Sequence, residues 1–129
     1  MAQLVVVDTD VLIDFLRGSG PAADLVEQLL RDDAFLVTVI TRFESAQGAN
    51  YPEEREKIEP LLSHSELPLT PIAASTAGDL SRELRRAGEA LATADILQAG
   101  ICLALGLPLA TKNVRHFERI PGLTLVSPE

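Results

Sequence analysis

The chain has 129 residues, 47% of them hydrophobic and 23% charged, which suits one globular domain and excludes a disordered segment. Its formal net charge of −8 argues against a simple nucleic-acid binder, which is usually basic, and favours a basic partner. The single cysteine, Cys102, excludes an internal disulfide, so a cytoplasmic protein is expected. No basic leader precedes the first strand-like run, and the longest apolar stretch, residues 96–110, is too interrupted and short to cross a membrane.

Strand-like and helical segments alternate along the first half of the chain. The apolar run at residues 4–7 predicts a buried strand, followed by a short helix that ends near Gly18. Pro21 opens a second helix, and residues 35–40 predict the next strand. A helix is expected to begin at Thr41 and to end near Gly48 or Asn50.

The second half of the chain repeats this alternation. The predicted segments are a helix from Pro52 to Leu62, a strand at 67–69, helices at 71–87 and 93–105, and strands at 107–110 and 123–126. This order predicts an α/β fold over residues 1–129, as one domain. Its central, mainly parallel sheet of four to five strands is flanked on both faces by helices.

Three acidic residues occupy positions where α/β proteins place their chemistry. Asp8 directly follows the first strand, Glu44 follows the strand at 35–40, and Asp95 lies in the first turn of the helix at 93–105. Ligands of an open parallel sheet bind outside the carboxyl ends of its strands. Carboxylates gathered there provide the oxygen ligands that Mg²⁺ and Mn²⁺ prefer, so the sequence predicts metal-assisted phosphodiester chemistry.

Structural roles compete with this interpretation of Asp8 and Glu44. Asp is a preferred helix N-cap, but the additional acids Asp10 and Asp14 make the patch denser than capping needs. Thr41 and Glu44 also match a capping box, in which the Glu carboxylate accepts from the backbone N–H of the cap residue. For Glu44 the sequence leaves capping and metal binding equally open.

Asp95 has a comparable structural explanation. It follows Thr93, a candidate N-cap, and a carboxylate in a first helical turn is favoured by the macrodipole by about 0.3–1 kcal/mol. The helix that follows is apolar and is expected to be buried, so it would hold Asp95 rigidly, as a metal ligand requires.

A polar and basic segment follows the strand at 107–110. Asn113 can support a nearby acid or a metal-bound water, while Thr111, Lys112 and Arg115 are candidates for contacting phosphates. An exposed polar loop explains the same residues equally well. His116 can serve as a general acid, although a histidine in this setting is more often a surface residue.

Four blocks of residues resemble those of PIN-domain ribonucleases, and most closely the VapC-type toxins of toxin–antitoxin systems. The blocks are residues 6–14, Glu44 with Gly48, residues 94–99, and residues 110–117 with 120–123. The resemblance implies a three-layer PIN-like fold in which Asp8, Glu44 and Asp95 are catalytic metal-binding acids. Asn113 stands at the family's fourth catalytic position, where Asp is common.

The resemblance also implies an activity and partners. It implies an endoribonuclease that depends on Mg²⁺ or Mn²⁺. The implied substrate is tRNA or rRNA, which Thr111, Lys112 and Arg115 would contact. It further implies a homodimer silenced by a cognate VapB-like antitoxin, which places a basic side chain in the acidic pocket.

Other functions remain open from the sequence. Asn113 leaves room for a degenerate PIN-like module that binds RNA or protein without catalysis. Asp8 and Asp10 match the Asp-x-Asp motif of a phosphatase, but the paired acids that such enzymes carry late in the chain are missing. A receiver domain would need a phospho-acceptor Asp where Thr41 or Thr70 stands.

Overall fold

The strands form one sheet in which all neighbours are parallel. The computed structural model describes residues 2–18, 20–47 and 53–128. The strand order is β3-β2-β1-β4-β5. The strands are β1 (Val5–Val7), β2 (Phe35–Thr38), β3 (Glu66–Leu67), β4 (Leu109–Ala110) and β5 (Leu125–Val126). The predicted α/β class with a five-stranded sheet is therefore confirmed, and the strands are shorter than predicted.

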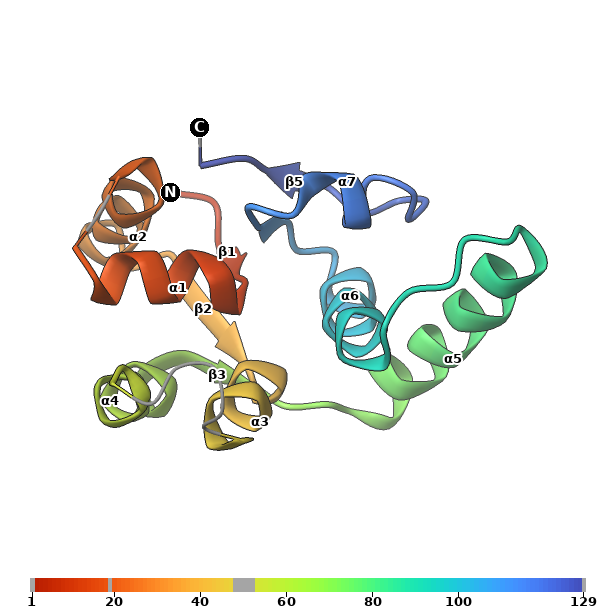
Figure 1. Ribbon diagram of the computed structural model, residues 1–129, viewed down its shortest axis with the longest axis horizontal. Coiled ribbons are helices and arrows are strands. Elements are labelled where there is room, and N and C mark those ends of the chain that lie inside the picture. The colour runs from red at the N-terminus through yellow and green to blue at the C-terminus, as the bar shows by residue number, and fades with distance from the viewer. Residues whose placement is uncertain (1, 19, 48–52, 129) are drawn as a thin grey trace.

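Helices connect and cover these strands (Figure 1). They are α1 (Thr9–Leu16), α2 (Gly20–Arg31), α3 (Val39–Gln47), α4 (Arg55–Ser65), α5 (Pro71–Arg86), α6 (Thr93–Leu105) and α7 (Val114–Phe117). The bounds of α6 are those predicted, whereas α7 lies in the segment expected to be a polar loop. The predicted helix end near Gly48 or Asn50 and the start at Pro52 fall outside the described residues.

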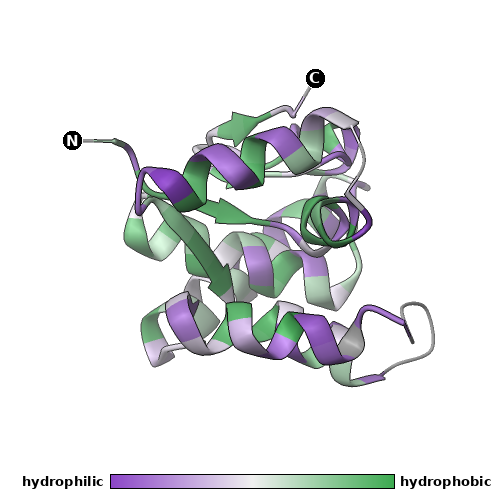
Figure 2. Ribbon diagram, turned by 90° about the vertical axis from the view of Figure 1, so that its left-hand side faces the viewer, coloured by the Kyte–Doolittle hydropathy of each residue, from purple (hydrophilic) through white to green (hydrophobic). Residues whose placement is uncertain are grey.

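Side chains of β1 alternate between two hydrophobic cores. Val5 and Val7 contribute to a core that includes residues of α1, α2 and α4, whereas Val6 lies in a core with residues of α5 and α6. This alternation follows from the two-residue period of a strand. Figure 2 shows mainly hydrophobic strands and, around them, helices in which hydrophobic and hydrophilic residues alternate. The layers are therefore helix, sheet and helix.

Helices α5 and α6 cross at close range. A Cβ atom added to Gly100 would lie 2.7 Å from the carbonyl oxygen of Ala73 and 2.7 Å from the Cβ of Ala77. Only a residue without a side chain permits this approach. Cys102 is fully buried in the adjoining core, in agreement with its predicted packing role, and burial raises the pKa of its thiol to about 12.

The strand order places a topological switch point between β1 and β4. From β1 the chain winds outward to β2 and β3, and it then crosses to the other side of β1 to form β4 and β5. At such a switch point the connections leave neighbouring strands in opposite directions, which opens a crevice at their carboxyl ends. Asp8 follows β1 and Thr111 follows β4, so both residues lie at this crevice. Within the described residues, no helix is long and apolar enough to span a bilayer.

Candidate active site

Asp8 is held at the crevice by three neutral hydrogen-bond donors. Its Oδ1 accepts from the backbone N–H of Thr9 at 2.9 Å and from the Gln98 amide at 3.4 Å, and its Oδ2 accepts from the Thr111 hydroxyl at 2.8 Å. Asp8 is the N-cap of α1, so the structural role considered from the sequence is real. The cap uses only one of these bonds. Gln98 and Thr111 come from α6 and from the end of β4, which shows that the carboxylate is also oriented by distant parts of the chain.

The environment of Asp8 disfavours its charged form. Burial, with the negative charge of Asp10 as the next cause, raises the pKa of Asp8 from 3.8 to about 7, against the lowering effect of the Thr111 bond. Burial also raises the pKa of Glu44, and the charge of Asp95 adds to that rise. The acids predicted from the sequence thus influence one another electrostatically. Perturbed carboxylates in a crevice are a common mark of a functional site.

Glu44 points toward the first turn of α1 and not toward its own helix N-terminus. Its Oε1 accepts from the Thr9 hydroxyl at 2.8 Å, and the same hydroxyl lies 2.9 Å from that of Thr41. The capping-box explanation is wrong, because α3 begins at Val39 and Thr41 is already inside the helix. The side chain of Thr38 instead accepts from the backbone N–H of Ile40, at 3.1 Å. Glu44 is therefore linked to Asp8 through the single residue Thr9.

Asp95 lies in the first turn of α6, as predicted, and faces α7. The N-cap of α6 is Ala92 and not Thr93, and it makes no side-chain capping bond. The Oδ2 atom of Asp95 lies 3.5 Å from Nδ1 of His116. The carboxylate is partly exposed and stands at the mouth of the site, whereas that of Asp8 lies at its buried end.

Residues 111–115, which follow β4, differ in their exposure and contacts. Thr111 is fully buried and its hydroxyl donates to Asp8, and its contact with phosphate stays a prediction. The Lys112 ammonium lies 2.7 Å from Oδ2 of Asp14. Asn113 is exposed at the start of α7, and its backbone N–H donates to the Thr111 hydroxyl at 3.0 Å. Arg115 is exposed on α7 and accessible to a ligand.

Sequence reasoning missed the neutral residues that organise these acids. Gln98 is almost fully buried in α6 and joins Asp8 to Thr38, whose hydroxyl donates to the amide oxygen of Gln98. Thr9 joins Asp8 and Glu44. The sequence did offer one signal, because Gln98 lies within an apolar helix and a buried amide requires polar partners. Which partners these would be could not be told from the sequence.

The donor chemistry of the site fits a hard divalent cation. Within residues 2–18, 20–47 and 53–128, no three His, Cys, Asp or Glu side chains form a ready set of metal ligands. The candidate ligands Asp8, Glu44 and Asp95 are nevertheless all carboxylates, which suits Mg²⁺ or Mn²⁺. Burial is the main cause of the raised pKa values of Asp8 and Glu44, and repulsion from neighbouring acids adds to it, so a bound cation would favour the ionised form of both carboxylates.

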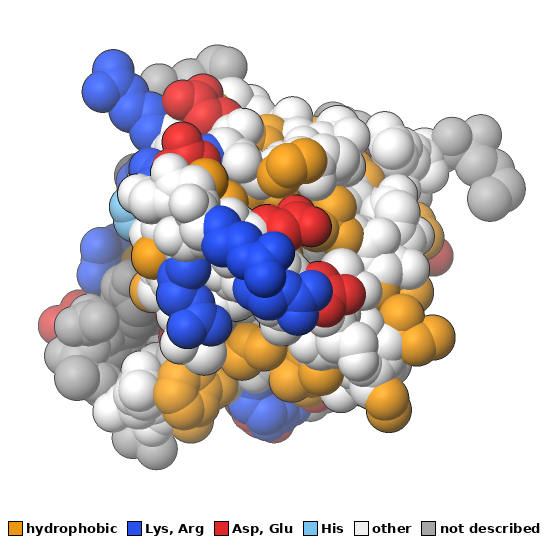
Figure 3. Space-filling model, turned by 90° about the vertical axis from the view of Figure 1, so that its right-hand side faces the viewer, with side chains coloured by type: hydrophobic (Ala, Val, Ile, Leu, Met, Phe, Trp, Pro, Cys, Tyr) orange, Lys and Arg blue, Asp and Glu red, His pale blue; other side chains and the backbone are white. Residues whose placement is uncertain are grey.

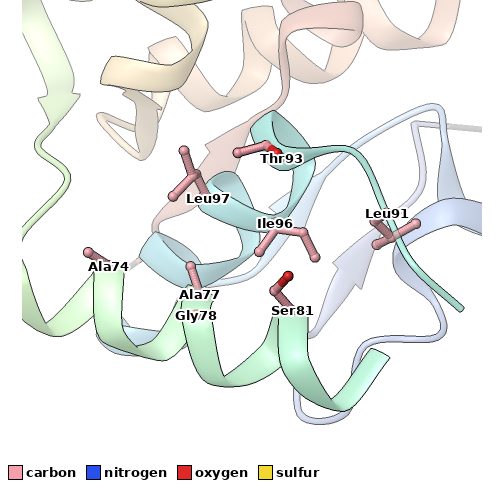
Figure 4. Close-up of a pocket in the computed structure, with 8 residues that line it drawn as sticks. All are labelled: Ala74, Ala77, Gly78, Ser81, Leu91, Thr93, Ile96 and Leu97. Carbon is pink, nitrogen blue, oxygen red and sulfur yellow. The ribbon is translucent and has the colours of Figure 1, made fainter. Parts of the chain in front are cut away.

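Two apolar pockets flank the start of α6 beside this site. One, of about 230 Å³, lies between α5 and α6, and Figure 4 shows Leu97, Ile96 and Leu91 around it with the Ser81 hydroxyl. The other, of about 370 Å³, lies against α3, where it includes the exposed Phe43. Neither is lined by an acidic residue. The carboxylate crevice is therefore the better candidate for phosphodiester chemistry.

Basic side chains also gather on the outer face of α5. Arg82, Arg85 and Arg86 are exposed there, and Arg82 pairs with Asp79 at 3.3 Å. Figure 3 shows Lys and Arg side chains bordered by acidic and hydrophobic ones on this side of the molecule. Because the charges are mixed, this face does not by itself indicate a nucleic-acid surface.

Comparison with protein families identifies the family to which this fold belongs. The family model described as the PIN domain matches residues 5–123, which include strands β1 to β4. This chain belongs to the PIN-domain family. The membership confirms the resemblance stated from the sequence and removes the receiver and phosphatase alternatives.

Curated relatives and solved structures agree with this assignment. The PIN domain described here is 35% identical to the Mycobacterium tuberculosis protein named Ribonuclease VapC10 over 114 residues, which cover 88% of this chain and 86% of that protein. It is 30% identical to Ribonuclease VapC19 of the same organism over 119 residues, covering 91% and 94%. A DNA-bound VapBC structure from Salmonella typhimurium matches with 25% identity and a TM-score of 0.83, covering 99% of this chain and 100% of that one. VapBC2 from Rickettsia felis, also bound to DNA, matches in fold with a TM-score of 0.80 at 19% identity, covering 97% and 98%.

Proposed function

We propose that this PIN domain is a metal-dependent endoribonuclease and the toxin of a toxin–antitoxin pair. The observation that carries the proposal is Asp8, a buried carboxylate of raised pKa at the switch point of the sheet, joined through Thr9 to a second acid, Glu44. The names of the curated relatives support ribonuclease activity, and the solved VapBC structures support the pairing with an antitoxin.

We assign Asp8, Glu44 and Asp95 as the groups that would hold Mg²⁺ or Mn²⁺. When bound, such an ion supplies an activated water and stabilises the charge that develops on the phosphate. Gln98 and Thr111 orient Asp8, so its oxygens keep a fixed direction without being neutralised by a cationic donor. This arrangement keeps the reacting groups positioned, which is the main contribution a protein makes to phosphoryl chemistry.

The residues on and before α7 complete the proposed site. Asn113 replaces the acid that is common at the fourth position, and we propose that its amide hydrogen-bonds near the metal without adding negative charge. Arg115 is proposed to contact an RNA phosphate, because it is exposed in α7 two residues after Asn113. The predicted substrates are tRNA or rRNA.

The proposed antitoxin is VapB-like and basic where it enters the site. The formal net charge of −8 and the acidic crevice favour a partner that brings Lys or Arg to Asp8 and its neighbours. A homodimer is proposed from the same family resemblance. Its test is the mass of the purified protein in solution, alone and with the antitoxin.

Cleavage of cellular RNA by the purified protein tests the enzyme assignment. We expect Mg²⁺-dependent cuts at a few sites that disappear with EDTA and with Asp8→Ala. A matched control, Asp24→Ala, removes an exposed acid of α2 and should cut at the wild-type rate. Cleavage that persists unchanged in Asp8→Ala excludes this site. Binding of RNA without cleavage by the wild type would favour the non-catalytic PIN-like module.

A further inference from the structure

Two acids of α1 hold the loop that connects β4 to α7. The backbone N–H of Lys112 donates to Oδ1 and Oδ2 of Asp10, at 3.4 and 3.2 Å. The Lys112 ammonium donates to Oδ2 of Asp14 at 2.7 Å. Asp10 and Asp14 are four residues apart and so lie on the same face of α1. Backbone and side chain of one loop residue are thus both attached to one helix.

Residues on either side of this attachment belong to the active site. Thr111 precedes Lys112 and donates its hydroxyl to Asp8 at 2.8 Å. Asn113 follows Lys112, and its backbone N–H donates to that same hydroxyl at 3.0 Å. A displacement of Lys112 would therefore move the donor that orients Asp8 and the residue at the fourth catalytic position. The contacts between this loop and α1 therefore help to determine the positions of Thr111 and Asn113.

The ion pair between Lys112 and Asp14 is partly exposed, so its main effect is on the conformation of the loop and not on the stability of the domain. The Asp14 side chain is 23% exposed and that of Lys112 is 45% exposed. Ion pairs in such positions contribute little to the stability of a whole domain. Their directional bonds can still select one loop conformation, on which catalysis depends more steeply than folding does.

We propose that Asp14 and Lys112 are positioning residues, whose ion pair fixes the β4–α7 loop so that the Thr111 hydroxyl keeps its hydrogen bonds to Asp8 and to the backbone N–H of Asn113. The expected effect on cleavage rests on the proposed nuclease function, whereas the expected effect on the loop conformation does not. It replaces the sequence-based expectation that Lys112 contacts an RNA phosphate directly. Arg115 keeps that expected role.

Cleavage kinetics distinguish positioning from phosphate binding. We expect Lys112→Met and Asp14→Asn each to lower kcat about tenfold with little change in KM, because the site is misaligned while the substrate surface is kept. The conservative variant Lys112→Arg and the charge exchange Asp14→Lys with Lys112→Asp should recover most of the lost kcat. As a matched control, Arg82→Met breaks an exposed ion pair of α5 and should leave both parameters unchanged.

The opposite pattern would overturn the proposal. If Lys112 contacts phosphate, Lys112→Met raises KM and reduces the slope of log affinity against log salt by about one, while Asp14→Asn does neither. The charge exchange would then fail to restore activity. Equal kinetics in the wild type and both single variants would also exclude a positioning role.

Amide hydrogen exchange tests the inference without RNA or metal. In Lys112→Met and Asp14→Asn we expect the amides of residues 111–113 to exchange about tenfold faster, with amides in α5 unaffected and the charge exchange restoring protection. Unchanged exchange in these residues refutes the loop attachment even if cleavage is impaired. A wild-type protein that cuts no RNA refutes the proposed function instead, and the exchange result then stands by itself.

Discussion

Replacing Asp8 with Asn is expected to stabilise the metal-free protein at about pH 8 and to change its stability little at about pH 4. Burial and then the charge of Asp10 raise the pKa of Asp8 from 3.8 to about 7. Between these values the folded protein binds a proton that the unfolded chain has released. The contribution of Asp8 to the free energy of unfolding therefore falls as pH rises through this window.

The size of the effect follows from the same shift. Above about pH 7 the ionised carboxylate costs the folded state about 4 kcal/mol. Asn retains an oxygen that accepts from Thr9 and Gln98, but its amide must donate to the Thr111 hydroxyl, which requires that hydroxyl to turn. Allowing about 1 kcal/mol for this rearrangement, we expect a net gain of about 3 kcal/mol.

Urea unfolding in EDTA, at both pH values, measures this gain. The variant Asp24→Asn neutralises an exposed acid and serves as the control, for which no comparable pH-dependent gain is expected. The reasoning is refuted if Asp8→Asn changes the free energy of unfolding equally at the two pH values, or if it lowers stability at the higher one. Added Mg²⁺ should stabilise the wild type more than Asp8→Asn, because the binding carboxylate is lost.

Three further substitutions test other contacts. Thr111→Val removes the hydroxyl that lies 2.8 Å from Asp8, so it should lower stability by about 1–3 kcal/mol and slow cleavage, whereas Thr111→Ser should do neither. Gly100→Ala would place a methyl group 2.7 Å from α5 and should cost about 1–3 kcal/mol in urea unfolding. Gly78→Ala, where nothing lies within 4 Å, should be neutral or stabilise by about 0.5–1 kcal/mol. Arg115→Ala should weaken RNA binding and reduce its salt slope by about one, and an unchanged slope would remove Arg115 from the phosphate contacts.

The sequence was sufficient where a feature depends on local patterns. The apolar run before Asp8 and the small and apolar residues of α6 specify a buried strand and a buried helix, and α6 begins and ends where predicted. The parallel sheet follows from the alternation of such segments. The positions of Asp8 after a strand and of Asp95 in a first helical turn could be predicted for the same reason, whereas Glu44 lies in the second turn of α3.

Features that depend on distant contacts could not be predicted in this way. Residues 39–40 continue a β-branched run and were expected to be strand, but Ile40 is buried in a core with residues of α5 and α6, and it lies in the first turn of α3. The four residues of α7 are too few to show a helical period. The bonds from Gln98 and Thr111 to Asp8 span 90 and 103 residues, so no spacing rule reveals them.

The same long separations determine when a newly made chain can become active. A ribosome releases Asp8 first, but two of the three donors that orient its carboxylate, Gln98 and Thr111, are added only with the final third of the protein. Nascent fragments that end before residue 111 therefore carry the acids without a functioning cutting centre. The ribonuclease proposed above would in this way stay inactive until its chain is nearly complete.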